Sequence, residues 1–91
     1  MAAEQRIFRF SGHVQGVGFR YTACRAAAGH EVTGYVRNCP DGSVECVVEG
    51  ETPEVEAFVA ELTRRMGQYI HKTACQKAPA CGHFDGFDVR F

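Results

Sequence analysis

A glycine-rich segment near the N-terminus separates an alternating apolar stretch from an alanine-rich one. Residues 7–10, Ile-Phe-Arg-Phe, place their two phenylalanines on one face, as in a β-strand with one covered side. Three glycines follow within the seven residues 12–18, and residues 19–28 have the alanine and arginine content of a helix. The sequence therefore predicts a strand, a glycine loop and a helix in that order, with Gly29 ending the helix.

The next segment has the pattern of a β-hairpin. Residues 32–38 alternate, and the turn at 38–42, Asn-Cys-Pro-Asp-Gly, offers Asp-Gly for positive φ angles. Residues 44–49 place Val, Cys and Val on one face and two glutamates on the other. The two strands are expected to pair antiparallel, with Cys46 in the core.

The C-terminal half contains one strongly periodic helix and two weaker strands. Residues 52–66 carry apolar side chains at helical spacing, with Thr52 as the expected N-cap and a proline in the first turn. Residues 68–76 indicate a weak strand, and residues 77–82 a connection. Residues 87–91 alternate as a last edge strand.

This order of elements defines a fold class. It is β-α-β-β-α-β with an additional terminal strand, which is typical of the ferredoxin-like split βαβ sandwich. That α+β fold has two helices on one face of a mostly antiparallel sheet. A length of 91 residues allows one core, so residues 1–91 are expected to form a single domain.

The charge is small overall but unevenly distributed. The formal net charge is −1, while residues 1–37 carry +3 and residues 38–91 carry −4. A nucleic-acid-binding domain would be basic overall, so the balance argues against a nucleic-acid partner. A small anionic ligand near the positive N-terminal half is the better expectation.

Cysteine usage and hydropathy indicate the compartment. Five cysteines are an odd number, and none is spaced as CxxC or as a zinc finger. They are expected to be buried or half-buried free thiols in a reducing cytosol. No apolar run is long enough for a membrane span or an export signal, so a cytoplasmic protein without a membrane partner is expected. The protein is also expected to be a monomer.

The loop at 12–18 is a candidate anion site. A glycine loop that leads into a helix can direct backbone N–H groups inward, where the helix N-terminus adds its own. Arg20 in the first helical turn opposes the helix dipole unless an anion is bound there, although a solvent-facing arginine is the alternative. Asn38 shares a face with Val36, the face toward the helices; it could reach the same cavity, or form an Asx turn before Pro40.

Two blocks of the chain resemble the motifs of the acylphosphatase family. Residues 11–20, Ser-Gly-His-Val-Gln-Gly-Val-Gly-Phe-Arg, match its G-x-V-Q-G-V-x-F-R loop. Residues 34–38, Gly-Tyr-Val-Arg-Asn, and 41–45, Asp-Gly-Ser-Val-Glu, match its G-x-V-x-N and D-G-x-V strand pair. The resemblance extends over the whole chain to residues 87–90, which are similar to the last strand of the family.

The resemblance implies a small hydrolase without metal or cofactor that splits acyl phosphates into carboxylate and inorganic phosphate, the latter also an inhibitor. It implies that Arg20 binds phosphate, that Asn38 positions the attacking water, and that phosphate oxygens accept the proton of that water. The implied phosphate-binding residues are Val14, Gln15, Gly16, Val17, Gly18, Phe19 and Arg20. No motif indicates which acyl phosphate is the substrate.

Two positions depart from the family or carry no role in it. His30 stands where the family typically has an apolar residue, so the connection after the first helix is expected to pack less well. The slightly acidic balance also differs from the often basic family members. His13 lies within the loop and is expected to face solvent without a catalytic role.

Three other functions remain as alternatives. The chain could be a non-catalytic module that binds an anion or acyl phosphate, like the segment at the start of certain carbamoyl-transfer maturation proteins. RNA-recognition modules share the element order, but residues 43–49 carry two carboxylates and no aromatic pair for stacking. Metal-thiol chemistry would need converging cysteines, and these are scattered along the chain.

Overall fold

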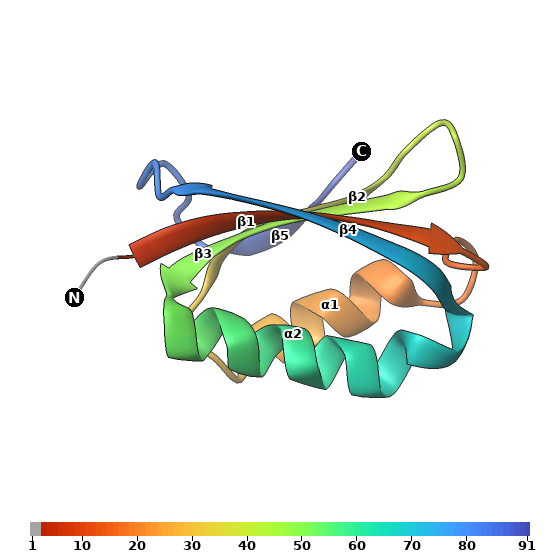
Figure 1. Ribbon diagram of the computed structural model, residues 1–91, viewed down its shortest axis with the longest axis horizontal. Helices are drawn as coiled ribbons and strands as arrows, with labels where there is room; N and C mark the ends of the chain where they lie inside the picture. The colour runs from red at the N-terminus through yellow and green to blue at the C-terminus, as the bar shows by residue number, and fades with distance from the viewer. Residues whose placement is uncertain (1–2) are drawn as a thin grey trace.

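A five-stranded sheet with two helices packed on one of its faces makes up residues 3–91, the part of the chain that the computed structural model describes (Figure 1). The strands are β1 (Ala3–Gly12), β2 (Thr33–Asn38), β3 (Val44–Glu51), β4 (Ile70–Pro79) and β5 (Phe87–Arg90). The helices are α1 (Phe19–Ala28), α2 (Thr52–Met66) and the short 3₁₀ helix η1 (Gly67–Tyr69). Within this part of the chain no helix is long and apolar enough to cross a membrane.

The topology confirms the predicted ferredoxin-like α+β class. The strand order is β4-β1-β3-β2-β5. All neighbouring strands are antiparallel except β2 and β5, which are parallel. The predicted hairpin is present, because β2 pairs with β3 from Thr33 opposite Glu49 to Asn38 opposite Val44.

The core lies between the sheet and the two helices. Cys46 is fully buried, as its position on the apolar face of β3 predicts, and burial raises the pKa of its thiol far above the ordinary value. The helical spacing of residues 52–66 is likewise confirmed by the buried side chains of α2. The main core side chains are Phe8, Phe10, Phe19, Ala23, Ala26, Val36, Val44, Cys46, Val48, Val55, Phe58, Leu62 and Met66.

Two predicted boundaries are wrong, each because a tertiary contact replaces the local signal. The N-cap of α2 is Glu51, and Thr52 is already helical; the Thr52 hydroxyl donates to Glu4 Oε1 at 2.9 Å instead of capping the helix. β4 begins after η1 and continues to Pro79, beyond the weak strand predicted to end at residue 76. It does so because β1 offers a pairing partner along its whole length, up to Glu4 opposite Pro79.

The cysteines and His30 also differ from the sequence expectation. Cys75 and Cys81 are exposed, because β4 is an edge strand and Cys81 lies in the connection after it. His30 is not loosely packed: its Nε2 atom lies 3.0 Å from Glu61 Oε1 on α2, and both side chains are only 19% exposed. This contact joins the end of α1 to the middle of α2.

A buried carboxylate holds the long connection between β4 and β5. These strands are at opposite edges of the sheet, so residues 80–86 must cross the face that the helices leave open. Glu49 on that face is 5% exposed and accepts hydrogen bonds from the Gln5 side chain at 2.6 Å, the Cys81 amide at 2.8 Å and the Gly82 amide at 3.1 Å. Burial alone would raise the pKa of Glu49, but these hydrogen bonds outweigh it and lower the pKa.

Replacing this carboxylate is expected to make the fold less stable and less sensitive to acid. Glu49→Gln should lower the free energy of unfolding by about 1–3 kcal/mol at neutral pH, because its NH₂ group faces backbone donors. The wild-type contribution is present above the ordinary glutamate pKa of about 4.3 and is lost as the pH falls through the lower pKa of the folded state. Between about pH 3 and pH 7, the Tm of Glu49→Gln should therefore change less with pH than the Tm of the unmodified protein. The exposed Glu31→Gln is the control, and equal acid sensitivity of both variants would contradict the assignment.

Candidate active site

Core side chains fix the glycine loop between β1 and α1 at both ends. Val14 is fully buried and Phe19 is 2% exposed, while His13 is exposed as predicted. Between them Gly16 and Gly18 have φ angles of 78° and 79°, and a Cβ atom at either position would meet no atom within 4 Å. These glycines are therefore required by backbone conformation and not by crowding within the protein.

The first turn of α1 presents backbone donors at the end of this loop. Gly18 is the N-cap residue, with no side-chain cap, and the first helical hydrogen bond runs from the Thr22 amide to the Gly18 carbonyl at 3.0 Å. The amides of residues 19–21 consequently have no partner within the helix. The first turn contains no acidic residue, and Arg20 occupies it. This geometry is suited to an anion.

A cavity of about 390 Å³ joins the loop, the helix start and the end of β2. It brings Arg20 and Asn38 together, two residues that the sequence proposed independently. Its lining residues are Val14, Gly16, Gly18, Phe19, Arg20, Tyr21, Cys24, Asn38, Val89 and Phe91. Of the predicted phosphate-binding residues, Gln15 and Val17 do not line it; Val17 packs against the core.

The sequence did not identify part of the cavity wall. Tyr21 and Cys24 lie further along α1, and Val89 comes from β5. β5 reaches the site because it pairs in parallel with β2, with Val89 opposite Val36. No local pattern in the sequence specifies that pairing. Cys24, and not the buried Cys39 beside Asn38, is the thiol that lines the cavity; burial and Asp88 raise its pKa.

Among the described residues, Arg20 differs from Arg6, Arg9 and Arg37 in forming no ion pair with a carboxylate. Arg6 pairs with Glu4 and Glu56, and Arg37 pairs with Glu45 at 2.7 Å. Within residues 3–91, by contrast, no carboxylate forms an ion pair with Arg20, whose guanidinium carbon lies 5.3 Å from the centroid of the Phe91 ring. Its charge is thus available to a ligand in the cavity.

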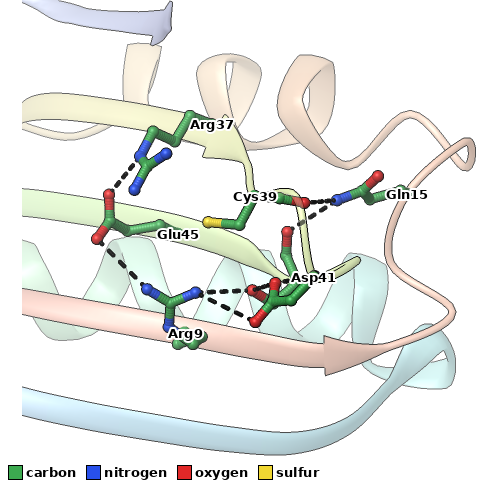
Figure 2. Close-up of polar contacts among 7 residues, drawn as sticks. Arg9, Gln15, Arg37, Cys39, Asp41 and Glu45 are labelled. Carbon is green, nitrogen blue, oxygen red and sulfur yellow. Dashed lines mark hydrogen bonds and ion pairs between the residues drawn. The ribbon is translucent and has the colours of Figure 1, made fainter. Parts of the chain in front are cut away.

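Asn38 is held at the last position of β2 by the turn that follows. The Cys39 amide donates to the Ser43 carbonyl at 2.8 Å, which closes the turn. The sequence predicts positive φ angles at both Asp41 and Gly42, but within the turn only Gly42 has one. The Gln15 side chain points to this turn and not into the cavity (Figure 2). The predicted role of Gln15 as a phosphate ligand would therefore fall to its backbone and not to its side chain.

The described residues 3–91 contain no group of three His, Cys, Asp or Glu side chains that could hold a metal ion. Whether the reaction is independent of metal remains a prediction, which a chelator can test. Donors at the cavity include the backbone amides of a helix N-terminus, the Arg20 guanidinium and the Asn38 carboxamide.

Comparison with known proteins agrees with this architecture. The acylphosphatase family model matches residues 6–89. The chain is 42% identical over 86 residues to the acylphosphatase of Syntrophotalea carbinolica, with 91% of each chain covered. The crystal structure of acylphosphatase from Bacillus subtilis superposes with a TM-score of 0.86 at 25% identity, over 97% of this chain and 99% of that one. The structure of T. kodakarensis HypF matches all of this chain but 12% of its own length, with a TM-score of 0.77 and 32% identity.

Fold and site together define a class: small ferredoxin-like domains in which a glycine loop, a helix N-terminus, an arginine and an asparagine surround one cavity. The sequence match over residues 6–89 is more specific than the fold. The chain belongs to the acylphosphatase family.

Proposed function

We propose that this chain hydrolyses acyl phosphates by in-line attack of water on phosphorus, with Arg20 and Asn38 in separate roles. Membership in the acylphosphatase family assigns the activity, and the observation that carries the mechanism is that Arg20 and Asn38 line the same cavity beside the glycine loop. The cavity offers hydrogen-bond donors and a positive charge, which suit a phosphoryl group.

The phosphoryl group lies against the amides of the loop and the first turn of α1, and Arg20 binds its oxygens. Charge on these oxygens in the transition state is stabilised by donors that the fold has already oriented. The carboxamide of Asn38 orients the water. The new bond forms between the water oxygen and phosphorus, the bond between phosphorus and the acyl oxygen breaks, the carboxylate leaves, and a phosphate oxygen accepts the proton of the water.

The remaining cavity wall receives the acyl group. A volume of about 390 Å³ falls within the range of small-molecule sites and exceeds what a phosphate group alone requires. Tyr21, Cys24 and Val89 make this part of the wall largely apolar. Contacts here are with the non-reacting part of the substrate, so they set acyl preference without taking part in the chemical step.

The second candidate function is that of a non-catalytic module that binds an anion or acyl phosphate. The match to T. kodakarensis HypF supports it, because a domain of this fold there is one part of a much longer chain. A binding module would retain the phosphate site without turnover, so an activity assay separates the two functions directly.

The cysteines and the charge balance bear on the cellular setting and on partners. The five cysteines are all free, which supports a reducing compartment such as the cytoplasm. We infer a single domain over residues 1–91 that acts as a monomer, without nucleic-acid or membrane partners. The net charge of −1 and the two glutamates on the strand that would have to stack bases support the absence of a nucleic-acid partner.

The purified protein is expected to hydrolyse acyl phosphates and to leave phosphomonoesters almost untouched. A carboxylate is a good leaving group that needs no general acid, whereas an alcohol leaving group would need one. Rates on a chromogenic acyl phosphate and on a simple monoester should be measured with and without a chelator. Comparable rates on both substrates, or loss of activity with the chelator, would refute the proposal. Phosphate binding without turnover would favour the binding module.

Arg20 and Asn38 are expected to separate in kinetic analysis. Arg20→Ala should weaken phosphate inhibition and turnover together, because the guanidinium contacts the phosphoryl group in ground and transition states. Asn38→Ala should lower kcat by roughly 10²–10³-fold, the scale of one lost oriented donor or acceptor, with little change in phosphate inhibition. Melting curves should show both variants folded. Near-normal kcat in Asn38→Ala would exclude the water-positioning role.

A pair of glycine substitutions isolates the loop geometry. Gly18 and Gly82 have φ angles of 79° and 72° and open space around the position of a Cβ, so alanine at either should cost about 1–2 kcal/mol of stability through the backbone alone. Only Gly18→Ala should also weaken the binding of inorganic phosphate, which is measured by competitive inhibition and by the rise in Tm on adding phosphate. If Gly82→Ala weakened phosphate binding equally, the effect would reflect general destabilisation and not the loop geometry.

A further inference from the structure

One side chain of the glycine loop serves the turn after Asn38 and not the cavity. The Gln15 Nε2 atom donates to the Cys39 carbonyl at 2.9 Å and to the Ser43 carbonyl at 2.9 Å (Figure 2). These acceptors lie 24 and 28 residues further along the chain. Both hydrogens of one amide group are thus used to join the loop to the β2–β3 turn.

The two carbonyls are the ones that define the turn. The Ser43 carbonyl also accepts from the Cys39 amide at 2.8 Å, and the Cys39 carbonyl from the Gly42 amide at 3.1 Å. Gln15 therefore reinforces the closure of the turn at its base. Because Asn38 directly precedes Cys39, the same bonds fix the distance between Asn38 and the loop.

Arg9 supports the turn from the open face of the sheet. Its Nη1 atom donates to the Ser43 hydroxyl at 2.9 Å and lies 3.7 Å from Asp41 Oδ2. Asp41 Oδ1 in turn accepts from the Ser43 amide at 2.9 Å and from its hydroxyl at 2.6 Å. Glu45, which binds Arg37 at 2.7 Å, lies 3.9 Å from Arg9 and helps to orient it (Figure 2). The turn is held from two sides.

We propose that Gln15 is a positioning residue for catalysis, which acts through Asn38 and not through the phosphate. The inference rests on the proposed function, in which Asn38 orients the attacking water. A water displaced by about 1 Å from its line of attack can cost on the order of 10²-fold in rate. Val14 and Phe19 anchor the phosphate cradle in the core without using the Gln15 side chain, so the cradle is expected to keep its position when the Gln15 contacts are lost.

A double-mutant cycle tests this role. Gln15→Met keeps the approximate size, removes both donors and adds no charge; it should lower kcat by about 10–100-fold, the scale of lost supporting contacts around a site. The phosphate inhibition constant should stay within about twofold, because the donors do not face the phosphate. In an Asn38→Ala background the same substitution should lower kcat by no more than about threefold, because the residue through which it acts is gone.

Gln5→Met is the matched control. The Gln5 side chain also donates through Nε2, to Glu49 Oε2 at 2.6 Å, on the open face of the sheet and outside the cavity. Gln5→Met should lower the free energy of unfolding without changing the kcat of the folded protein. Arg9 does not line the cavity but supports the same turn. Arg9→Met should lower kcat about threefold, a smaller loss than in Gln15→Met, because Gln15 still holds the turn.

Three outcomes would overturn the inference, and they are distinguishable. An equal loss of kcat in both backgrounds would show that Gln15 acts independently of Asn38. Weaker phosphate inhibition in Gln15→Met would show that it supports the cradle. Near-normal kcat in Asn38→Ala would remove the residue through which Gln15 acts and would reject that part of the proposed function; the family activity would stand.

Discussion

The site depends on the burial of two side chains that flank the glycine loop. Val14 and Phe19 are buried in the core, so both ends of the loop between them are held in place even though two of its residues are glycines with positive φ. Packing supplies the rigidity and glycine supplies the conformation. Donors fixed in this way do not have to be reorganised when charge develops on a ligand, which is the main requirement for stabilising a phosphoryl group.

The periodic parts of the fold could be predicted from the sequence, whereas its long-range pairings could not. The alternation at residues 44–49 and the helical spacing at residues 52–66 report directly on one buried face, and both are confirmed. Thr52 has the residue type of an N-cap, but a hydroxyl that finds Glu4 leaves the cap to Glu51. Such a partner is 48 residues away in sequence, and no local pattern indicates it.

The candidate site shows the same division. Arg20 and Asn38 were identified because a motif and a resemblance mark them, and the structure places both at one cavity, while their roles stay predictions. Gln15 belongs to the same motif, yet its side chain bonds to carbonyls of a turn that only the folded sheet brings near. A motif therefore indicates that a position matters to the site, and only the contacts indicate how.

Electrostatics explain why a nearly neutral protein can still attract an anion. The positive excess of residues 1–37 is largely neutralised on folding, because Arg6, Arg9 and Arg37 all meet carboxylates. Among the described residues, what remains at the cavity is Arg20 together with the amides at the start of α1 that have no partner within the helix. Such a field is local and short-ranged. It acts on a group that enters the cavity and falls off within the first turn of the helix, so a small anion meets it more fully than an extended polyanion does.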